Sequence, residues 1–397
     1  MARKKYDIAV IGAGLNGLVI SHALAKSGKK IALIESQEKL GGIFQDSTTR
    51  LGSLPDFFSH LSFNKELEEN FSRWTSKIFE EQEQSYLKPE LVTKTFDSGK
   101  FKDFVGFGDK SPDFVDEITE YTNSTKLQMQ TGFTEIVKSY ISDLEQSENV
   151  DILFNSTLTG FHLEEGRLDL IEVNDGKKIE ADEYIYTANL FTLNELDEIE
   201  ILSKAQRQSL AKASSFTAIH LQFIHPGSEL PIDKDYILAA AKDKSQACYG
   251  QFSLATNFAN AQAEAYQIST WMSFVESSLT NDMELTGNLV REMKRQVKRA
   301  FPEAIESSEF ERVFVAPNSH CTNKVKVKDF KSDKYPNFYI LSRELDEVQG
   351  VMGRIHTAVQ LLDELDIALA KFQSPEIVDT VENSVDNLEA SAQTDVV

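Results

Sequence analysis

The chain has 397 residues, 41% of them hydrophobic, which is enough for a large core. A chain of this length usually folds into two domains. Its formal net charge of −22 argues against a nucleic-acid partner and an anionic membrane surface, because contacts with phosphate need Lys and Arg. The sequence has no apolar run of about 18 residues or more, so we expect no transmembrane segment.

The cysteines, the histidines and the N-terminus bear on cofactor type and location. Cys248 and Cys321 fit neither a metal-binding spacing nor a disulfide framework. His60, His220 and His356 have no ligand-like spacing either, so we predict no metal site. The basic N-terminus leads into an apolar run that Gly12 interrupts, which is typical of a strand and not of a signal peptide. We therefore expect a cytoplasmic protein.

Residues 6–42 follow the order strand, glycine turn, helix, strand, acid. Residues 8–11 are a short, mostly β-branched run of the kind that a buried parallel strand uses. The turn from Gly12 to Gly17 comes next, then a helical stretch, and then an apolar strand at residues 31–34 that ends in Glu35. This order predicts the first βαβ unit of a dinucleotide-binding domain.

Each glycine of the turn has a physical role in such a unit. Gly12 permits the tight turn, Gly14 lets a diphosphate approach the backbone, and Gly17 lets the helix pack close to the strand. The N-terminus of the helix then directs its N–H groups and positive dipole end at the phosphates. Glu35 follows Gly17 by 18 residues. This is close to the roughly 20 expected of an acid that binds ribose hydroxyls, and an acid here argues against NADP.

A second glycine pair, Gly41 and Gly42, extends the motif. Together with the GxGxxG turn and Glu35, it resembles the N-terminus of the FAD-dependent amine oxidase, phytoene desaturase and protoporphyrinogen oxidase superfamily. UDP-galactopyranose mutase and the Rab GDP-dissociation inhibitors share that fold. The chain departs from the pattern at Ile43, where many members have Arg, and at residues 52–60, where a glycine-rich turn usually approaches the flavin.

The resemblance implies FAD as the cofactor. In this part of the chain, the residues that it places against the cofactor are Gly12, Gly14, Leu15, Asn16, Gly17, Glu35, Gly41 and Gly42.

The middle of the chain matches the same superfamily more loosely. Apolar residues recur on one face from Phe133 to Leu144, which predicts an amphipathic helix. Short strands separated by hairpin-type turns follow over residues 150–188. In the superfamily, the residue that matches Leu158 contacts the adenine through its backbone.

In residues 206–332, apolar and polar residues alternate in the way typical of β-strands, and one clear helix follows near 287–301. This helix has a basic face with Lys294, Arg295, Lys298 and Arg299. The face is either a site for an anionic substrate or an ordinary solvated helix surface. Catalytic residues are not identifiable from the sequence, because in flavin chemistry the reactive atoms belong to the cofactor.

The end of the chain contains the main departure from the superfamily. A strand at residues 338–341 and a glycine turn leading into a helix are present. The Gly-Asp pair that follows this strand in the superfamily, and whose acid holds the ribityl chain, is replaced by Ser342 and Arg343. The resemblance implies cofactor contacts from Ser342 and Met352. Residues 373–397 are acidic, and we predict a disordered tail.

The predicted fold class is α/β: a Rossmann-like FAD/NAD(P)-binding domain with a parallel sheet, interleaved with a mixed α+β substrate domain. We assign residues 1–60, 128–205 and 333–372 to the dinucleotide-binding domain. The substrate domain takes residues 61–127 and 206–332.

Three functions fit these features. The first is an FAD-dependent oxidoreductase that abstracts a hydride from a small-molecule substrate, either a small amine or a lipophilic metabolite. The second is a binding protein that kept the fold and lost the flavin, as in the Rab inhibitors. Ser342-Arg343 favours it, and the intact glycines with Glu35 disfavour it. The third is a non-redox flavoenzyme acting on a sugar nucleotide. The oligomeric state stays open.

Overall fold

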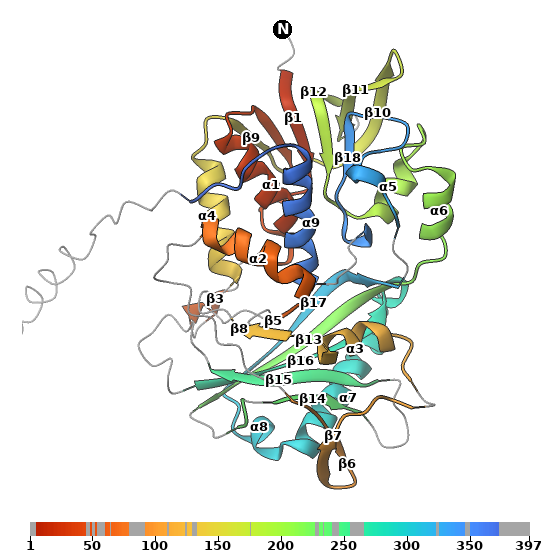
Figure 1. Cartoon of the computed structure of the whole chain (residues 1–397). Helices are drawn as coiled ribbons and strands as arrows, with labels where there is room; N and C mark the ends of the chain where they lie inside the picture. Colours follow the sequence, from red (N-terminus) through yellow and green to blue (C-terminus); the bar gives the residue numbers. More distant parts are fainter. Residues whose placement is uncertain are drawn as a thin grey trace, which may run out of the picture.

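The structure of the chain is a computed structural model with two large β-sheets (Figure 1). It describes residues 5–44, 48–49, 52–53, 60–63, 65–78, 92–108, 111–123, 125–128, 133–174, 176–226, 230–232, 234–239, 246–254, 266–322, 325–345 and 350–372. The predicted tail at 373–397 and most of the departure at 52–60 lie outside these residues.

The first sheet has the strand order β10-β11-β12-β1-β2-β9, with β18 paired to β12. Strands β12, β1, β2, β9 and β18 are parallel, while β10 and β11 add an antiparallel hairpin beside β12. Its strands are β1 (Lys5–Ile11), β2 (Ile31–Ile34), β9 (Val150–Leu153), β10 (Leu158–Glu164), β11 (Arg167–Val173), β12 (Lys177–Tyr186) and β18 (Phe338–Ile340). The carboxyl ends of the parallel strands meet at one edge, which is where open α/β sheets bind ligands.

Both faces of this sheet are buried. Strand β1 directs Ile8 and Val10 into one apolar cluster and Ala9 and Ile11 into the other, which explains its unbroken apolar sequence. The helices that join the first cluster are α1 (Leu15–Lys26), α2 (Lys65–Ile78), α4 (Phe133–Glu145) and α9 (Gly350–Glu364). Helices α5 (Leu190–Leu196) and α6 (Lys204–Leu210) join the second.

Helix α2 packs with this first sheet, although the sequence predicts residues 61–127 in the substrate domain. Its Phe71 and Trp74 belong to the first cluster, and Trp74 Nε1 donates to the Tyr140 hydroxyl at 3.0 Å. Arg73 forms a bidentate pair with Asp363 of α9, at 2.8 and 2.6 Å. Helical periodicity shows that a face is apolar without showing which sheet it covers. The rest of the domain division stays a proposal.

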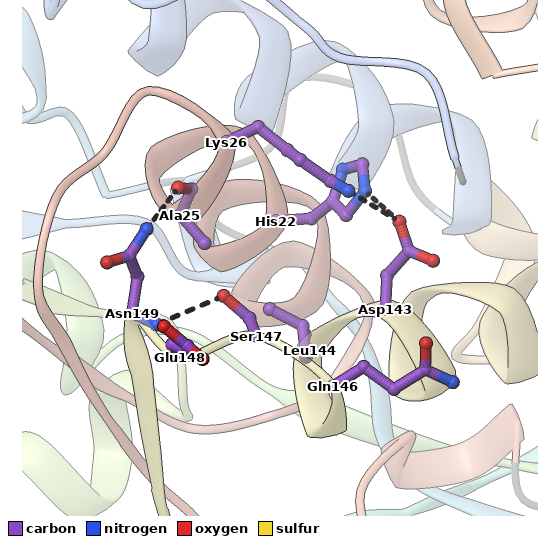
Figure 2. Close-up of a pocket in the computed structure, with 9 residues that line it drawn as sticks. All are labelled: His22, Ala25, Lys26, Asp143, Leu144, Gln146, Ser147, Glu148 and Asn149. Atoms are coloured by element: carbon purple, nitrogen blue, oxygen red, sulfur yellow. Dashed lines mark hydrogen bonds and ion pairs between the residues drawn. The ribbon is translucent and has the colours of Figure 1, made fainter.

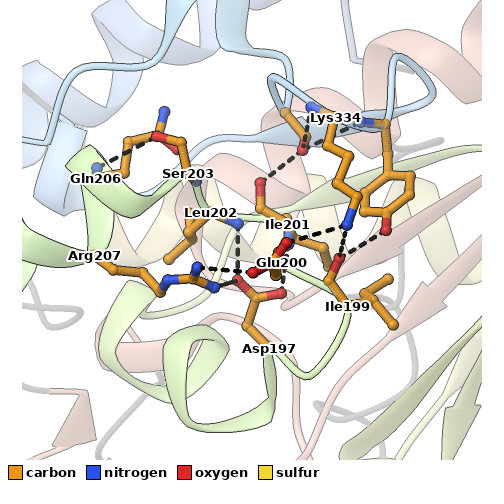
Figure 3. A network of polar contacts seen from close by, with 11 residues as sticks. Asp197, Ile199, Glu200, Ile201, Leu202, Ser203, Gln206, Arg207 and Lys334 are labelled. Carbon is orange, nitrogen blue, oxygen red and sulfur yellow. Dashed lines mark hydrogen bonds and ion pairs between the residues drawn. The ribbon is translucent and has the colours of Figure 1, made fainter.

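A polar network fixes the connection between α5 and α6 (Figure 3). The buried carboxylate of Asp197 accepts from the backbone N–H groups of Ile201 and Leu202, at 2.5 and 2.8 Å. Lys334 donates to the Ile199 carbonyl at 3.0 Å, which ties this connection to the loop before β18. The network therefore helps to position β18 in the sheet.

The second sheet has the strand order β17-β13-β16-β15-β14-β6-β7. All neighbours are antiparallel except β14 and β6. Its strands are β6 (Val92–Asp97), β7 (Lys100–Asp103), β13 (Ser215–Pro226), β14 (Lys234–Leu238), β15 (Cys248–Leu254), β16 (Tyr266–Glu276) and β17 (Phe310–Cys321). Helices α7 (Met283–Ala300) and α8 (Pro302–Glu306) cover the face away from the first sheet, and α3 (Val115–Asn123) lies on the face turned toward it (Figure 1).

The smaller elements are β3 (Thr48–Thr49), β4 (Gly52–Ser53), β5 (His60–Phe63), β8 (Thr125–Gln128) and the 3-10 turns η1 (Gly42–Phe44), η3 (Ser277–Leu279), η4 (Lys328–Phe330) and η5 (Arg343–Leu345). In the parts of the chain that the structure describes, no helix combines the length and the apolar character needed to cross a membrane.

Three of the four basic side chains on α7 lie beside acids, and the fourth, Arg299, donates to the Ala239 carbonyl at 2.7 Å. Lys294 pairs with Glu311 at 2.6 Å, and Lys298 lies 3.7 Å from Glu306. Arg295 pairs with Glu292 one turn earlier in the same helix. These contacts favour the solvated-surface interpretation over an anion site.

Gly250 tests the packing of the second sheet. It lies opposite Trp271 in the β15–β16 pair, and a Cβ atom there would be 2.1 Å from the buried indole ring. We predict that Gly250→Ala lowers the free energy of unfolding by about 1–3 kcal/mol, as overpacking does. Gly287→Ala, in α7 with its nearest contact at 3.6 Å, is the control, and there alanine raises the free energy by roughly 0.5–1 kcal/mol. Urea denaturation measures both, and equal effects would contradict this packing.

Candidate functional site

The glycine turn after β1 is fixed by the end of β12. Gly12 has a φ of +103°, which favours glycine, and its N–H donates to the Ile34 carbonyl at 2.8 Å. The Thr187 hydroxyl shares its one proton between the carbonyl oxygens of Ile11 and Gly12, which lie 3.0 and 2.8 Å away. Three adjacent strands, β2, β1 and β12, therefore hold the turn at the carboxyl edge of the sheet.

Gly17 and Gly14 lack side chains for different reasons. A Cβ on Gly17 would lie 1.9 Å from the Gly12 carbonyl oxygen, so α1 packs directly on the turn. A Cβ on Gly14 would have no described atom within 4 Å, and its φ of −71° suits any residue. The fold itself does not need glycine at position 14. The open space beside it lies at the N-cap of α1, where no side chain of the described residues caps the helix.

The first turn of α1 supplies the remaining donors of the site. The backbone N–H groups at a helix N-terminus have no intrahelical acceptor, and the helix dipole is positive there. Leu15 and Asn16 occupy this turn. Asn16 is only 6% exposed, and its Oδ1 atom has no hydrogen-bond partner among the described residues. The free N–H groups and the positive dipole end suit an anionic group such as a diphosphate, whereas the Asn16 Oδ1 atom is an acceptor and needs a donor.

Glu35 connects the end of β2 to the turn. Its carboxylate accepts from the Ala13 N–H through Oε2 and from the Gln37 N–H through Oε1, both at 2.9 Å. A carboxylate oxygen accepts more than one hydrogen bond, so Oε2 retains capacity for a ribose hydroxyl. Ser156 N–H donates to the Glu35 carbonyl at 2.8 Å, which places the segment leading to Leu158 beside this end of β2.

The second glycine pair lies against the first turn. Gly41 N–H donates to the Ala13 carbonyl at 3.0 Å, and a Cβ on Gly42 would lie 3.3 Å from the Gly14 Cα. Both glycines have positive φ angles, +103° and +56°. The structure thus brings both glycine motifs and Glu35 together at one edge of the sheet.

Ser342 is turned into the protein. Its hydroxyl oxygen lies 2.6 Å from the Ala188 carbonyl oxygen and also contacts the carboxylate of Glu344, so its one proton serves these two acceptors. Glu344 is fully buried and also accepts from Leu190 N–H at 3.2 Å and from Arg343 Nε at 2.9 Å. Arg343 reaches the second sheet, where it donates to the Pro317 carbonyl at 3.0 Å. We call Ser342, Arg343 and Glu344 the clasp, because they join β18, the start of α5 and β17.

The clasp was not predicted from the sequence. Position 343, where the superfamily has an acid, is Arg in this chain. The next residue, Glu344, is an acid, and it binds the start of α5. The signal in the sequence was an acid directly after the departure from the superfamily pattern. Met352 lies in the first turn of α9 with its side chain in the core, so only its backbone N–H is available to a ligand.

A separate pocket of about 300 Å³ lies at the other end of α1 (Figure 2). Asp143 contacts His22 Nε2 at 3.0 Å and Lys26 Nζ at 3.2 Å. Burial lowers the pKa of His22, although Asp143 opposes the shift. His22 is therefore neutral near pH 7, and Lys26 balances the carboxylate. The pocket adjoins the last turns of α1, and the glycine turn adjoins its first, so the two sites are separate.

Two family models match the chain. The NAD(P)-binding Rossmann-like domain matches residues 10–60, and the flavin containing amine oxidoreductase family matches residues 43–347. The chain belongs to the flavin-containing amine oxidoreductase family. This confirms the superfamily and the α/β fold class predicted from the sequence. At the level of the family it also confirms the flavin cofactor.

Solved structures resemble nearly the whole chain. A putative protoporphyrinogen oxidase from Exiguobacterium sp. 255-15 has a TM-score of 0.61 at 13% identity, over 92% of this chain and 100% of that one. An oxidoreductase from Methanosarcina mazei has 0.58 at 12%, over 91% and 100%. A Rab GDI from Plasmodium falciparum has 0.51 at 12%, over 92% and 98%. At these identities the likeness shows the fold alone.

A local match links the chain to one curated enzyme. UDP-galactopyranose mutase from Mycoplasma pneumoniae is 50% identical over 38 residues, which make up 10% of this chain and 10% of that enzyme. So short a match carries no conclusion about the reaction.

Gly17 and Gly14 lead to opposite predictions for stability. Gly17→Ala should lower the free energy of unfolding by about 1–3 kcal/mol, because the methyl group meets the Gly12 carbonyl. Gly14→Ala should change it by less than about 1 kcal/mol. The same Gly14→Ala variant should weaken FAD binding at least tenfold, because the methyl group fills the space left for the diphosphate.

Urea denaturation measures the stability of both variants, and quenching of FAD fluorescence measures binding. A Gly14→Ala variant that binds FAD as tightly as the unmodified protein would contradict this account of the site.

Proposed function

We propose that the chain is an FAD-dependent oxidoreductase that takes a hydride from a small-molecule amine. The observation that carries the proposal is the open space at Gly14, framed by the N-terminus of α1 and the carboxylate of Glu35. Family membership supplies the flavin, and this edge of the sheet fits the adenosine diphosphate half of FAD. When bound, the flavin accepts the hydride, so the protein needs to bind and orient.

Each residue of the site has a proposed role. The first turn of α1, including the amides of Leu15 and Asn16, offsets the negative charge of the diphosphate. Glu35 accepts from the ribose, and the backbone at Leu158 contacts the adenine. The other proposed contacts come from Gly12, Gly14, Gly17, Gly41 and Gly42 and from the backbone of Ser342 and Met352. A cytoplasmic location belongs to the same proposal.

A second candidate is a binding protein of this fold that lost the flavin. The clasp favours it, because Ser342 and Glu344 bind other parts of the protein where the superfamily has a Gly-Asp pair for the flavin. Against it stands Gly14, for which the folded chain alone has no steric need.

The visible absorption spectrum of the purified protein, taken before and after adding and removing FAD, separates these candidates. The oxidoreductase proposal expects flavin bands near about 370 and 450 nm, and bleaching of the longer-wavelength band when an amine is added without oxygen. A colourless protein that does not retain added FAD would contradict the oxidoreductase proposal and favour the binding protein that lost the flavin. A yellow protein that no amine bleaches, but that binds sugar nucleotides, would favour the non-redox flavoenzyme.

A further inference from the structure

A row of polar side chains crosses the second sheet on the face turned toward the first. The strands place each member directly opposite the next, in the order Arg312, Gln222, Thr270, Gln251 and Asp235. These five residues are the polar row. Two positions farther along their strands, Tyr249 and Met272 belong to the apolar cluster that contacts α3, so the row lies on the same face as that cluster.

Three side chains of the polar row, those of Gln222, Gln251 and Asp235, are buried, while those of Arg312 and Thr270 are partly exposed. The row is also partly bonded within itself. Arg312 Nε donates to Gln222 Oε1 at 2.7 Å, and Gln222 Nε2 donates to Thr270 Oγ1 at 3.3 Å. Gln222 and Asp235 have no exposed surface. Burying polar groups costs free energy that hydrogen bonds must offset. Polar residues on five neighbouring strands therefore require a reason beyond packing.

The centre of the row has two unused donors. The Thr270 hydroxyl accepts from Gln222, and it donates to no residue that the structure describes. Gln251 accepts from the Tyr249 hydroxyl at 3.4 Å, and its amide nitrogen likewise has no acceptor in the described part of the chain. Gln251 is nine-tenths buried. Side chains directly opposite one another have Cβ atoms about 4.5–5.5 Å apart, so the Thr270 and Gln251 side chains leave the sheet as neighbours.

We propose that the polar row recognises a carboxylate on the substrate, and hence that the substrate is an amino acid and not a simple amine or an apolar metabolite. Paired donors with a guanidinium in the same row match the two oxygens of a carboxylate. This inference rests on the proposed function, because the amino group of the substrate is inferred from the proposed amine oxidation and not from the polar row. The row has one cation, Arg312, and one anion, Asp235, which suits a zwitterion. The net charge of −22 would repel a simple anion.

The test is a binding measurement on the purified protein with its flavin. The probes are the twenty common L-amino acids and their decarboxylated amines, compared pair by pair. The readouts are the thermal unfolding midpoint and the difference spectrum of the flavin bands. At least one amino acid should raise the midpoint and shift the bands, and its decarboxylated partner should do neither. An amine that binds as well as its amino acid, or a panel without any binding, would overturn the inference.

Two variants locate the binding at the polar row. Thr270→Val and Gln251→Glu should each weaken binding of the amino acid at least about tenfold, as loss of a hydrogen bond to a charged group does. Gln146→Glu is the matched control, because it makes the same chemical change at the exposed end of α4. Both row variants should keep the FAD content of the unmodified protein. Unchanged binding in a folded Thr270→Val variant would overturn the assignment.

The outcomes separate the two proposals. A protein that lacks flavin but binds an amino acid through Thr270 and Gln251 supports the polar row and contradicts the oxidoreductase. A flavoprotein that an amine without a carboxylate reduces supports the oxidoreductase and contradicts the polar row.

Discussion

The contact between α1 and the Gly12 carbonyl is the constraint on which the site depends. With a Cβ at position 17 only 1.9 Å from that oxygen, the helix begins as close to β1 as a backbone allows. This close approach directs the first turn of α1 at the edge of the sheet. The Thr187 hydroxyl and the N–H of Gly12 then fix the turn from the strands on either side. The space at Gly14 is a consequence of this arrangement, and the second glycine pair and Glu35 border it.

The two sheets meet the requirements of a flavin oxidoreductase in different ways. The first supplies a rigid edge for a nucleotide, and its residues follow from a short sequence motif. The second has no motif, but it presents an apolar surface interrupted by the polar row on the face toward the first sheet. Between them, the clasp joins β18 to the start of α5 and to β17 through the buried carboxylate of Glu344. It occupies the chain position where the superfamily has its flavin-facing acid.

The parts of the fold predicted from the sequence are those that local chemistry decides. The glycine turn, β1, α1, β2 and Glu35 lie within 31 consecutive residues, from Lys5 to Glu35, and each residue type there has its own steric or polar reason. The helix at Phe133–Glu145 follows from periodicity alone. Helix α2 was assigned to the other domain, because its apolar face would suit either sheet.

The features that the sequence did not reveal depend on contacts between distant residues. Nothing in the local sequence distinguishes Glu344 from other acids, because its partner Leu190, whose N–H donates to it, lies 154 positions away. The polar row combines residues from five strands, and only the register of those strands aligns them. A single polar residue in an alternating strand is unremarkable, so no local pattern marks the row.

The central claim is that the edge formed by Gly14, Glu35 and the first turn of α1 binds the adenosine diphosphate half of a flavin dinucleotide. Equilibrium dialysis of the flavin-free protein against FAD, ADP and FMN tests it most directly, because ADP contains only that half and FMN lacks it. We expect FAD to bind most tightly, ADP to bind and to compete with it, and FMN to bind weakly or not at all. FMN binding as tightly as FAD, with no binding of ADP, would contradict the claim.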